Sequence, residues 1–136
     1  MKLQGTYLGD LRCEFAQPAT GAVLGTDARM EETADRSGMC YPTELLAAAL
    51  GACTMTVLGF VARRLEVDVT GTKVEVEHVM TEDHHKVAKI EVTYILPAGD
   101  WPAKVRKQFE RAVRRCPVHA SLHPDIEQVF NFVWPE

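Results

Sequence analysis

Four cysteines carry the most distinctive chemistry in this chain: Cys13, Cys40, Cys53 and Cys116. A thiolate is a nucleophile and a soft metal ligand, and it can be oxidised reversibly. The chain has no Cys-x-x-Cys pair, which excludes the thioredoxin-type motif and the commonest zinc-finger patterns. Its N-terminal segment lacks the apolar core of a secretory signal, so we expect a cytoplasmic location. In that reducing compartment the cysteines are expected to be thiols, metal ligands or a transient redox pair.

Cys53 and Cys116 differ in their local settings. Cys53 lies in an apolar segment, where a lone cysteine is usually a small core side chain and where burial raises a thiol pKa. Cys116 precedes Pro117 and is placed to cap a following helix, whose N-terminal dipole favours a thiolate. Arg114 and Arg115 add positive charge there. These local features predict that Cys116 is the more acidic thiol, but they do not show that the two thiols meet.

Histidines after Cys116 allow a metal-binding alternative. In the segment CPVHASLH, the spacings from Cys116 to His119 and from His119 to His123 put three ligand types on about two turns of helix. Cys40 or His78 could supply a fourth ligand, although no spacing connects either residue to this cluster. Zinc therefore stays open as an alternative to thiol chemistry.

A long apolar helix is expected to carry Cys53. In PTELLAAALGACTMTVLGFVARR, Pro42 suits the first helical position, and Glu44 meets the positive end of the helix dipole. The uncharged stretch 45–62 is at the short limit for a membrane span. Because glycines and threonines interrupt it and no other segment is membrane-like, we expect a buried central helix. In so short a chain, an intertwined homodimer would supply the cover that such a helix needs.

The rest of the chain predicts an α+β domain. Segments with alternating polarity, which are typical of strands, are 3–8, 11–16, 22–25, 67–81, 86–96 and 126–134. An amphipathic helix is expected over 101–115, a shorter one is expected from Pro117, and a polar loop is expected over 27–40. This order predicts a single domain over residues 1–136, with an antiparallel sheet around the buried helix.

The charge balance bears on possible partners. The net charge is −4 over 136 residues, which does not favour a nucleic-acid partner. Basic residues gather between Lys104 and Arg115 at helical intervals, with Glu110 among them, and we expect them to form a solvated helix face. We therefore expect neither nucleic-acid nor membrane partners.

Two motifs carry a resemblance to a known family. The segment PTELLAAALGAC resembles the OsmC/Ohr signature: a proline, an acidic residue, two leucine-like residues and an alanine-rich run that ends in cysteine. The segment RCPVHASL resembles the second motif of the family, a Cys-Pro pair that opens a short helix. Cys116 follows Cys53 by 63 positions, which also suits the family. With the expected order of elements, the likeness covers almost the whole chain.

The resemblance implies a peroxidase. Members of the family are α+β homodimers with two sites at the dimer interface, and many reduce organic hydroperoxides. By this likeness Cys53 would attack the peroxide and become a sulfenic acid, and Cys116 would condense with it to a disulfide. An external dithiol would restore both thiols, and no metal or organic cofactor is required. Apolar side chains at Leu50, Met55 and Phe60 would suit a hydrophobic peroxide, although a plain core would explain them equally well.

The sequence departs from the family at one position. Peroxidases of the family carry a glutamate directly after the signature proline, and this chain has Thr43 there. Glu44 is a weak substitute, because nine helical positions turn it about 180° away from Cys53. The thiolate-stabilising arginine of the family comes from the early strands or loop, where Arg12 is the first candidate and Arg29 and Arg36 follow.

The departure at Thr43 leaves a second alternative open. A non-catalytic homodimer could bind a small apolar ligand, with Cys53 as a core side chain. Cys13, in an alternating segment, is expected to be packed. Cys40, just before the long helix, is a reserve thiol.

Overall fold

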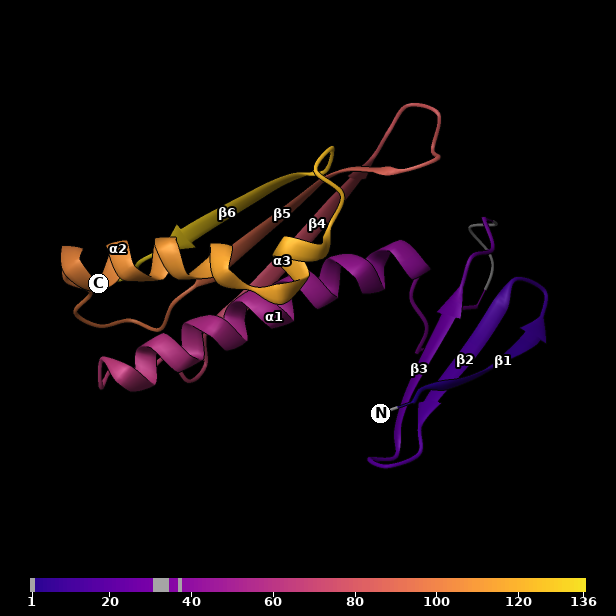
Figure 1. Cartoon of the computed structure of the whole chain (residues 1–136), viewed down its shortest axis with the longest axis horizontal. Helices are drawn as coiled ribbons and strands as arrows, with labels where there is room; N and C mark the ends of the chain where they lie inside the picture. Colours follow the sequence, from indigo (N-terminus) through magenta and orange to yellow (C-terminus); the bar gives the residue numbers. More distant parts are fainter. Residues whose placement is uncertain (1, 31–34, 37) are drawn as a thin grey trace. The chain divides into compact units, whose positions relative to one another are not determined.

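The computed structural model describes residues 2–30, 35–36 and 38–136 (Figure 1). The contacts form two compact units, residues 1–45 and 46–136, so the expected single domain stays a prediction. The mixed α+β class is confirmed. The elements in chain order are β1 (Gln4–Gly9), β2 (Arg12–Gln17), β3 (Ala22–Asp27), α1 (Pro42–Arg64), β4 (Lys73–Met80), β5 (Val87–Ile95), α2 (Ala103–Ala112), the 3-10 turn η1 (Val113–Arg115), α3 (Pro117–Ser121) and β6 (Glu127–Val133).

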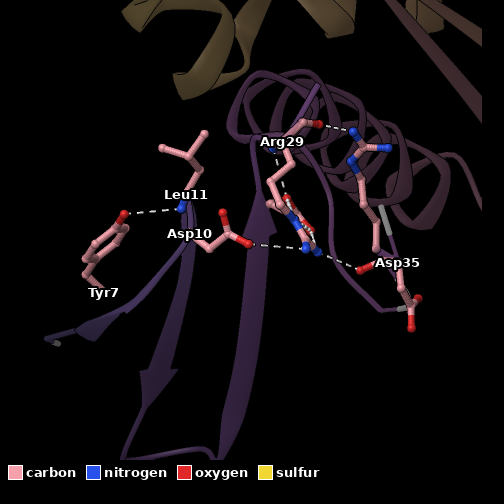
Figure 2. A network of polar contacts seen from close by, with 7 residues as sticks. Tyr7, Asp10, Leu11, Arg29 and Asp35 are labelled. Atoms are coloured by element: carbon pink, nitrogen blue, oxygen red, sulfur yellow. Dashed lines mark hydrogen bonds and ion pairs between the residues drawn. The ribbon is translucent and has the colours of Figure 1, made fainter. Parts of the chain in front are cut away.

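The first unit contains the predicted antiparallel meander, in the order β1-β2-β3. The turn between β1 and β2 passes through Gly9, Asp10 and Leu11, all with positive φ. The Leu11 amide in this turn donates a hydrogen bond of 3.2 Å to the Tyr7 hydroxyl (Figure 2). The third strand runs on to Asp27, two residues past its expected end. Residues 31–34 and 37 of the expected loop lie outside the described residues.

The second unit contains a three-stranded sheet, in the order β4-β5-β6. The expected hairpin forms between β4 and β5, but β4 begins only at Lys73, because residues before it form turns. The sixth strand pairs with β5 in parallel, with Lys89 beside Glu127. The expectation of a wholly antiparallel sheet is therefore wrong at this pairing. The segment that contains α2 and α3 carries the chain back to the start of β5, so β6 runs in the same direction as β5.

The long helix α1 packs on this sheet. A Cβ at Gly51 would lie 2.6 Å from a methyl group of Val76, so the helix backbone approaches β4 closely. Leu50 and Leu58 are fully buried, whereas Phe60 is 64% exposed. By length and composition alone α1 is long and apolar enough to span a membrane, but a core helix can meet the same criteria. In the most apolar stretch of 18 residues within α1, 39% is buried. Burial on all sides is therefore not reached within a single chain.

Candidate functional site

The two cysteines singled out by the sequence meet in the second unit. Cys53 lies in the middle of α1 and is half-buried, and Cys116 stands at the start of α3 and is fully buried. Cys53 packs against the core that contains Cys116, close enough to raise the pKa of the Cys116 thiol, and both cysteines are free thiols. The fold thus brings together two sulfur atoms that are remote in sequence.

Cys116 caps α3 as expected. Its backbone is extended (φ −74°, ψ 133°), Pro117 follows at the first helical position, and its Sγ accepts the His119 amide at 3.4 Å. Burial nevertheless raises the pKa of Cys116, and the neighbouring Cys53 thiol raises it further. The local features that predicted the more acidic thiol at Cys116 are therefore outweighed. Loss of solvent outweighs the lowering effect of two backbone amides, because a thiolate is far better solvated in water than in an apolar core.

Two polar side chains near the thiol pair were missed by the sequence analysis. The Tyr94 hydroxyl of β5 donates to the Thr54 hydroxyl, and Thr54 donates to the Leu50 carbonyl at 2.8 Å. Both side chains are fully buried, and Thr54 follows Cys53 directly in α1. Burial raises the pKa of Tyr94, and the neighbouring Cys116 adds to this rise, while Thr54 opposes it. The inward position of Tyr94 follows from strand alternation, but its contact with Thr54 spans 40 residues of sequence.

The structure does not support the zinc alternative. Within the described ranges, no three histidine, cysteine or acidic side chains are arranged to hold a metal ion. Nδ1 of His119 lies 2.5 Å from Oε1 of Gln128, and the His119 ring packs edge-on against the ring of Phe130. His123 is mostly exposed and lies beside Asp125 instead.

The candidate arginines belong to the first unit and differ in their contacts. Arg29 forms ion pairs with Asp27 at 2.6 Å and with Asp10 at 3.5 Å (Figure 2). Its guanidinium lowers the pKa of Asp27 to about 2, despite the burial of that carboxyl. Arg36 donates to the Arg29 carbonyl and stacks over the ring of Tyr41.

Arg12 has a different setting from Arg29. Its Nε is buried and has no hydrogen-bond partner in the part of the chain that the structure describes. A buried guanidinium N–H that lacks a protein partner is costly, so this group is available for a further interaction.

Glu44 has a local partner at the start of α1. Its Oε1 accepts the backbone amide of Tyr41 at 2.7 Å. This is the reciprocal half of a capping box, in which a carboxylate at the third helical position satisfies the amide of the capping residue. Glu44 and Cys53 also stand about 180° apart around the helix. The geometry gives Glu44 a role in starting α1.

Comparison with known proteins places these features in a family. Residues 35–129 match the family model described as OsmC-like protein. The chain shares 32% sequence identity with a protein of known crystal structure from Psychrobacter arcticus 273-4, provisionally described as an osmotic stress induced and detoxification response protein. The two structures superpose with a TM-score of 0.88. That match covers 98% of this chain and 96% of the other. Comparison with curated proteins gives no significant match.

More distant structures share the fold. An OsmC-like protein from Mycoplasma pneumoniae is 17% identical, with a TM-score of 0.81 over 99% of this chain and 96% of that chain. The organic hydroperoxide resistance protein OhrB of Bacillus subtilis is also 17% identical, with a TM-score of 0.63 and 98% of each chain covered. At these identities the likeness is one of fold alone.

Proposed function

The chain belongs to the family of OsmC-like proteins, and we propose from this premise that it is a thiol-dependent peroxidase that reduces organic hydroperoxides. The observation that carries the proposal is that Cys53 packs against the core that contains Cys116 and raises the pKa of its thiol. Two neighbouring free thiols, one half-buried and the other fully buried, suit a reaction in which one sulfur meets the substrate and the other follows.

In the proposed reaction the half-buried Cys53 attacks first. Its thiolate takes the distal oxygen of the hydroperoxide, the O–O bond breaks, and the alkoxide takes up a proton and leaves as the alcohol. Cys53 is then a sulfenic acid. The sulfur of Cys116 attacks it, a disulfide forms and water leaves, so the two thiols together supply the two electrons. An external dithiol reduces the disulfide by exchange.

The properties of Cys116 fit the second position. Its raised pKa keeps it protonated, so it can donate its hydrogen to the Cys53 sulfur before the first step. A hydrogen bond of this kind favours the charged form of the sulfur that accepts it. A fully buried thiol also does not meet the peroxide directly, which separates the two roles.

For the cation that favours the Cys53 thiolate, we propose Arg12. The reason is the buried Nε of Arg12, whereas the guanidinium of Arg29 is held by two aspartates and that of Arg36 donates to the Arg29 carbonyl. For the substrate we propose a hydrophobic hydroperoxide. Met55 and Ala52 line an apolar cavity of about 390 Å³ between α1 and β4. Leu50 belongs to the core instead, since it is fully buried.

Treatment of the full chain with cumene hydroperoxide tests the proposal. We expect two thiols per chain to be lost and peptide mapping to find Cys53 linked to Cys116. Cys53→Ser should abolish peroxide consumption. Cys116→Ser should consume one equivalent and stop at a sulfenic acid, which dimedone traps. Cys13→Ser and Cys40→Ser are the matched controls and should behave as the parent does.

The proposal is contradicted if Cys53 and Cys116 both stay free after this treatment. If in addition the parent consumes no peroxide and Cys53→Ala keeps its stability, the alternative of a non-catalytic dimer gains. Arg12→Gln separately tests the cation. It should slow the reaction of Cys53 with peroxide at neutral pH and leave formation of the disulfide from the sulfenic acid unchanged.

A further inference from the structure

A cavity with strongly basic walls lies between α1 and α2. It has a volume of about 340 Å³, and Val61 and Gln108 contribute its remaining lining. The basic side chains that line it come from the end of α1, from α2 and from η1. They are Arg64, Lys104, Lys107, Arg111 and Arg115.

Among the residues that the structure describes, no acidic side chain lines this cavity. Within the described ranges, none of the five basic residues forms an ion pair with a carboxylate. All five are exposed, so their ends are free to turn toward a ligand. The protein as a whole has a net charge of −4, which makes this concentration of positive charge a local feature and not a general one.

Helix dipoles explain only part of the cluster. Arg64 and Arg111 lie in the last turns of α1 and α2, where a cation offsets the negative end of a helix. Lys104 lies in the first turn of α2, where the dipole disfavours a cation and where no acidic residue compensates. The helix would be more stable with the opposite charge there, so its own stability does not account for Lys104.

Other arginines of the same segment have a different setting. Arg106 stacks over the ring of Trp134 at 5.3 Å, and Arg114 stacks over Phe130 at 5.7 Å. Arg106 and Arg114 therefore cover aromatic rings. In the described part of the chain the five cavity residues have no such aromatic partner, although the sequence pattern predicted one solvated helix face over Lys104 to Arg115. What distinguishes the five is that they converge on one cavity between α1 and α2.

We propose that this cavity binds a compact multivalent anion of the polyphosphate type. Its volume lies at the lower end of the range of small-molecule sites, which suits a short phosphate chain better than a nucleic-acid duplex. Arginine forks can bind phosphate oxygens in pairs, and lysines add point charges. The Gln108 amide can donate a neutral hydrogen bond from the cavity lining. Neither thiol of the proposed peroxidase site lines the cavity, so this proposal does not rest on the peroxidase function.

Calorimetric titration of the full chain with sodium triphosphate tests the proposal. We expect saturable binding of one triphosphate per chain, weakened by added NaCl because the contacts are exposed. Lys107→Glu and Arg64→Gln should each weaken binding by at least about tenfold, because each removes a charge-assisted contact. Thermal unfolding checks that each variant is folded.

Lys73→Glu is the matched control. It makes the same change of charge as Lys107→Glu at an exposed position of β4, outside the cavity. We expect it to change the affinity by less than about twofold. Absence of saturable binding, or an equal loss in Lys73→Glu, would overturn the proposal.

Two further ligands test the class of anion. Sodium sulfate at matched ionic strength should bind much more weakly than triphosphate, and an equal affinity would reduce the site to a general attraction for anions. A hexaglutamate peptide that binds more tightly than triphosphate would contradict the small-anion proposal and indicate a docking surface for an acidic protein. Titration of ATP in parallel separates a nucleotide from a free polyphosphate within the proposed class.

Discussion

At the level of single residues, burial decides the chemistry of the thiol pair. Cys116 has two features that usually make a thiol acidic, a position at a helix N-terminus and backbone amides directed at its sulfur. Its pKa is raised all the same, because the side chain is fully buried and the Cys53 thiol lies beside it. The same burial suits Cys116 to the second step of a disulfide-forming reaction.

The Tyr94–Thr54 contact gives a prediction about stability. Tyr94→Phe should lower the free energy of unfolding by about 1 kcal/mol, because Thr54 keeps its bond to the Leu50 carbonyl. Thr54→Val should cost more, about 1–3 kcal/mol, because it leaves the Tyr94 hydroxyl buried without its partner. Urea unfolding of both variants and of the double variant measures the coupling. A smaller loss in Thr54→Val than in Tyr94→Phe would contradict the contact.

Asp27 gives a prediction about acid stability. Arg29 holds its folded-state pKa at about 2, below the ordinary value of 3.8. The stabilisation that this carboxylate contributes is therefore present above that ordinary value and is lost as the pH falls toward the folded-state value. We expect the stability of the parent to fall more steeply over this interval than that of Asp27→Asn, as measured by urea unfolding at several pH values. Parallel curves for the two proteins would contradict the assignment.

At the level of elements, α1 serves three purposes with different parts of its surface. Its first turn is stabilised by Glu44, its inner face packs on β4 through Gly51, and its middle presents Cys53 to Cys116. The nearly uniform apolar character of the helix conceals these differences. Packing, and not polarity, therefore distinguishes one side of α1 from another.

Two glycines of α1 test this distinction. Gly51→Ala should destabilise the protein by about 1–3 kcal/mol, because the new Cβ would lie 2.6 Å from Val76. A Cβ at Gly59 meets none of the described residues within 4 Å, so Gly59→Ala should stabilise the helix by up to about 1 kcal/mol. Thermal and urea unfolding of the two variants measure the contrast. Equal effects at both positions would contradict the close approach of α1 to the sheet, and a loss at Gly59 would indicate that another surface covers it.

At the level of the whole molecule, a single chain leaves apolar side chains of α1 exposed. Phe60 is 64% exposed and Leu46 is 37% exposed. Apolar surface of this kind is often covered by a partner chain. A homodimer therefore stays our prediction for the assembly, for the physical reason already visible in the length and apolar character of this helix.

Sedimentation velocity tests the homodimer. The parent is expected to sediment as a dimer, and Phe60→Glu should shift it toward the monomer, because the variant would bury a carboxylate in an apolar contact. Val79→Glu, at a side chain of β4 that is 50% exposed, is the control and should remain dimeric. A monomeric parent at high concentration would exclude the dimer.

Much of the fold could be predicted from periodicity. The alternation in the early segments predicted β1, β2 and β3, and the long apolar run predicted α1. The direction of β6 could not be predicted in this way, since alternation has the same pattern in parallel and antiparallel strands. That direction depends on where α2 and α3 return the chain.

The sequence by itself determined which residues could do chemistry and in which elements they lie: two cysteines, each in a family-like motif, one in a long helix and one before Pro117. Only the tertiary structure decided that these thiols meet, that Cys116 has a raised rather than a lowered pKa, and that Tyr94 and Thr54 stand nearby. The reason is physical. Local sequence determines helix caps and strand alternation, whereas desolvation and long-range contacts depend on what the rest of the chain places around each group.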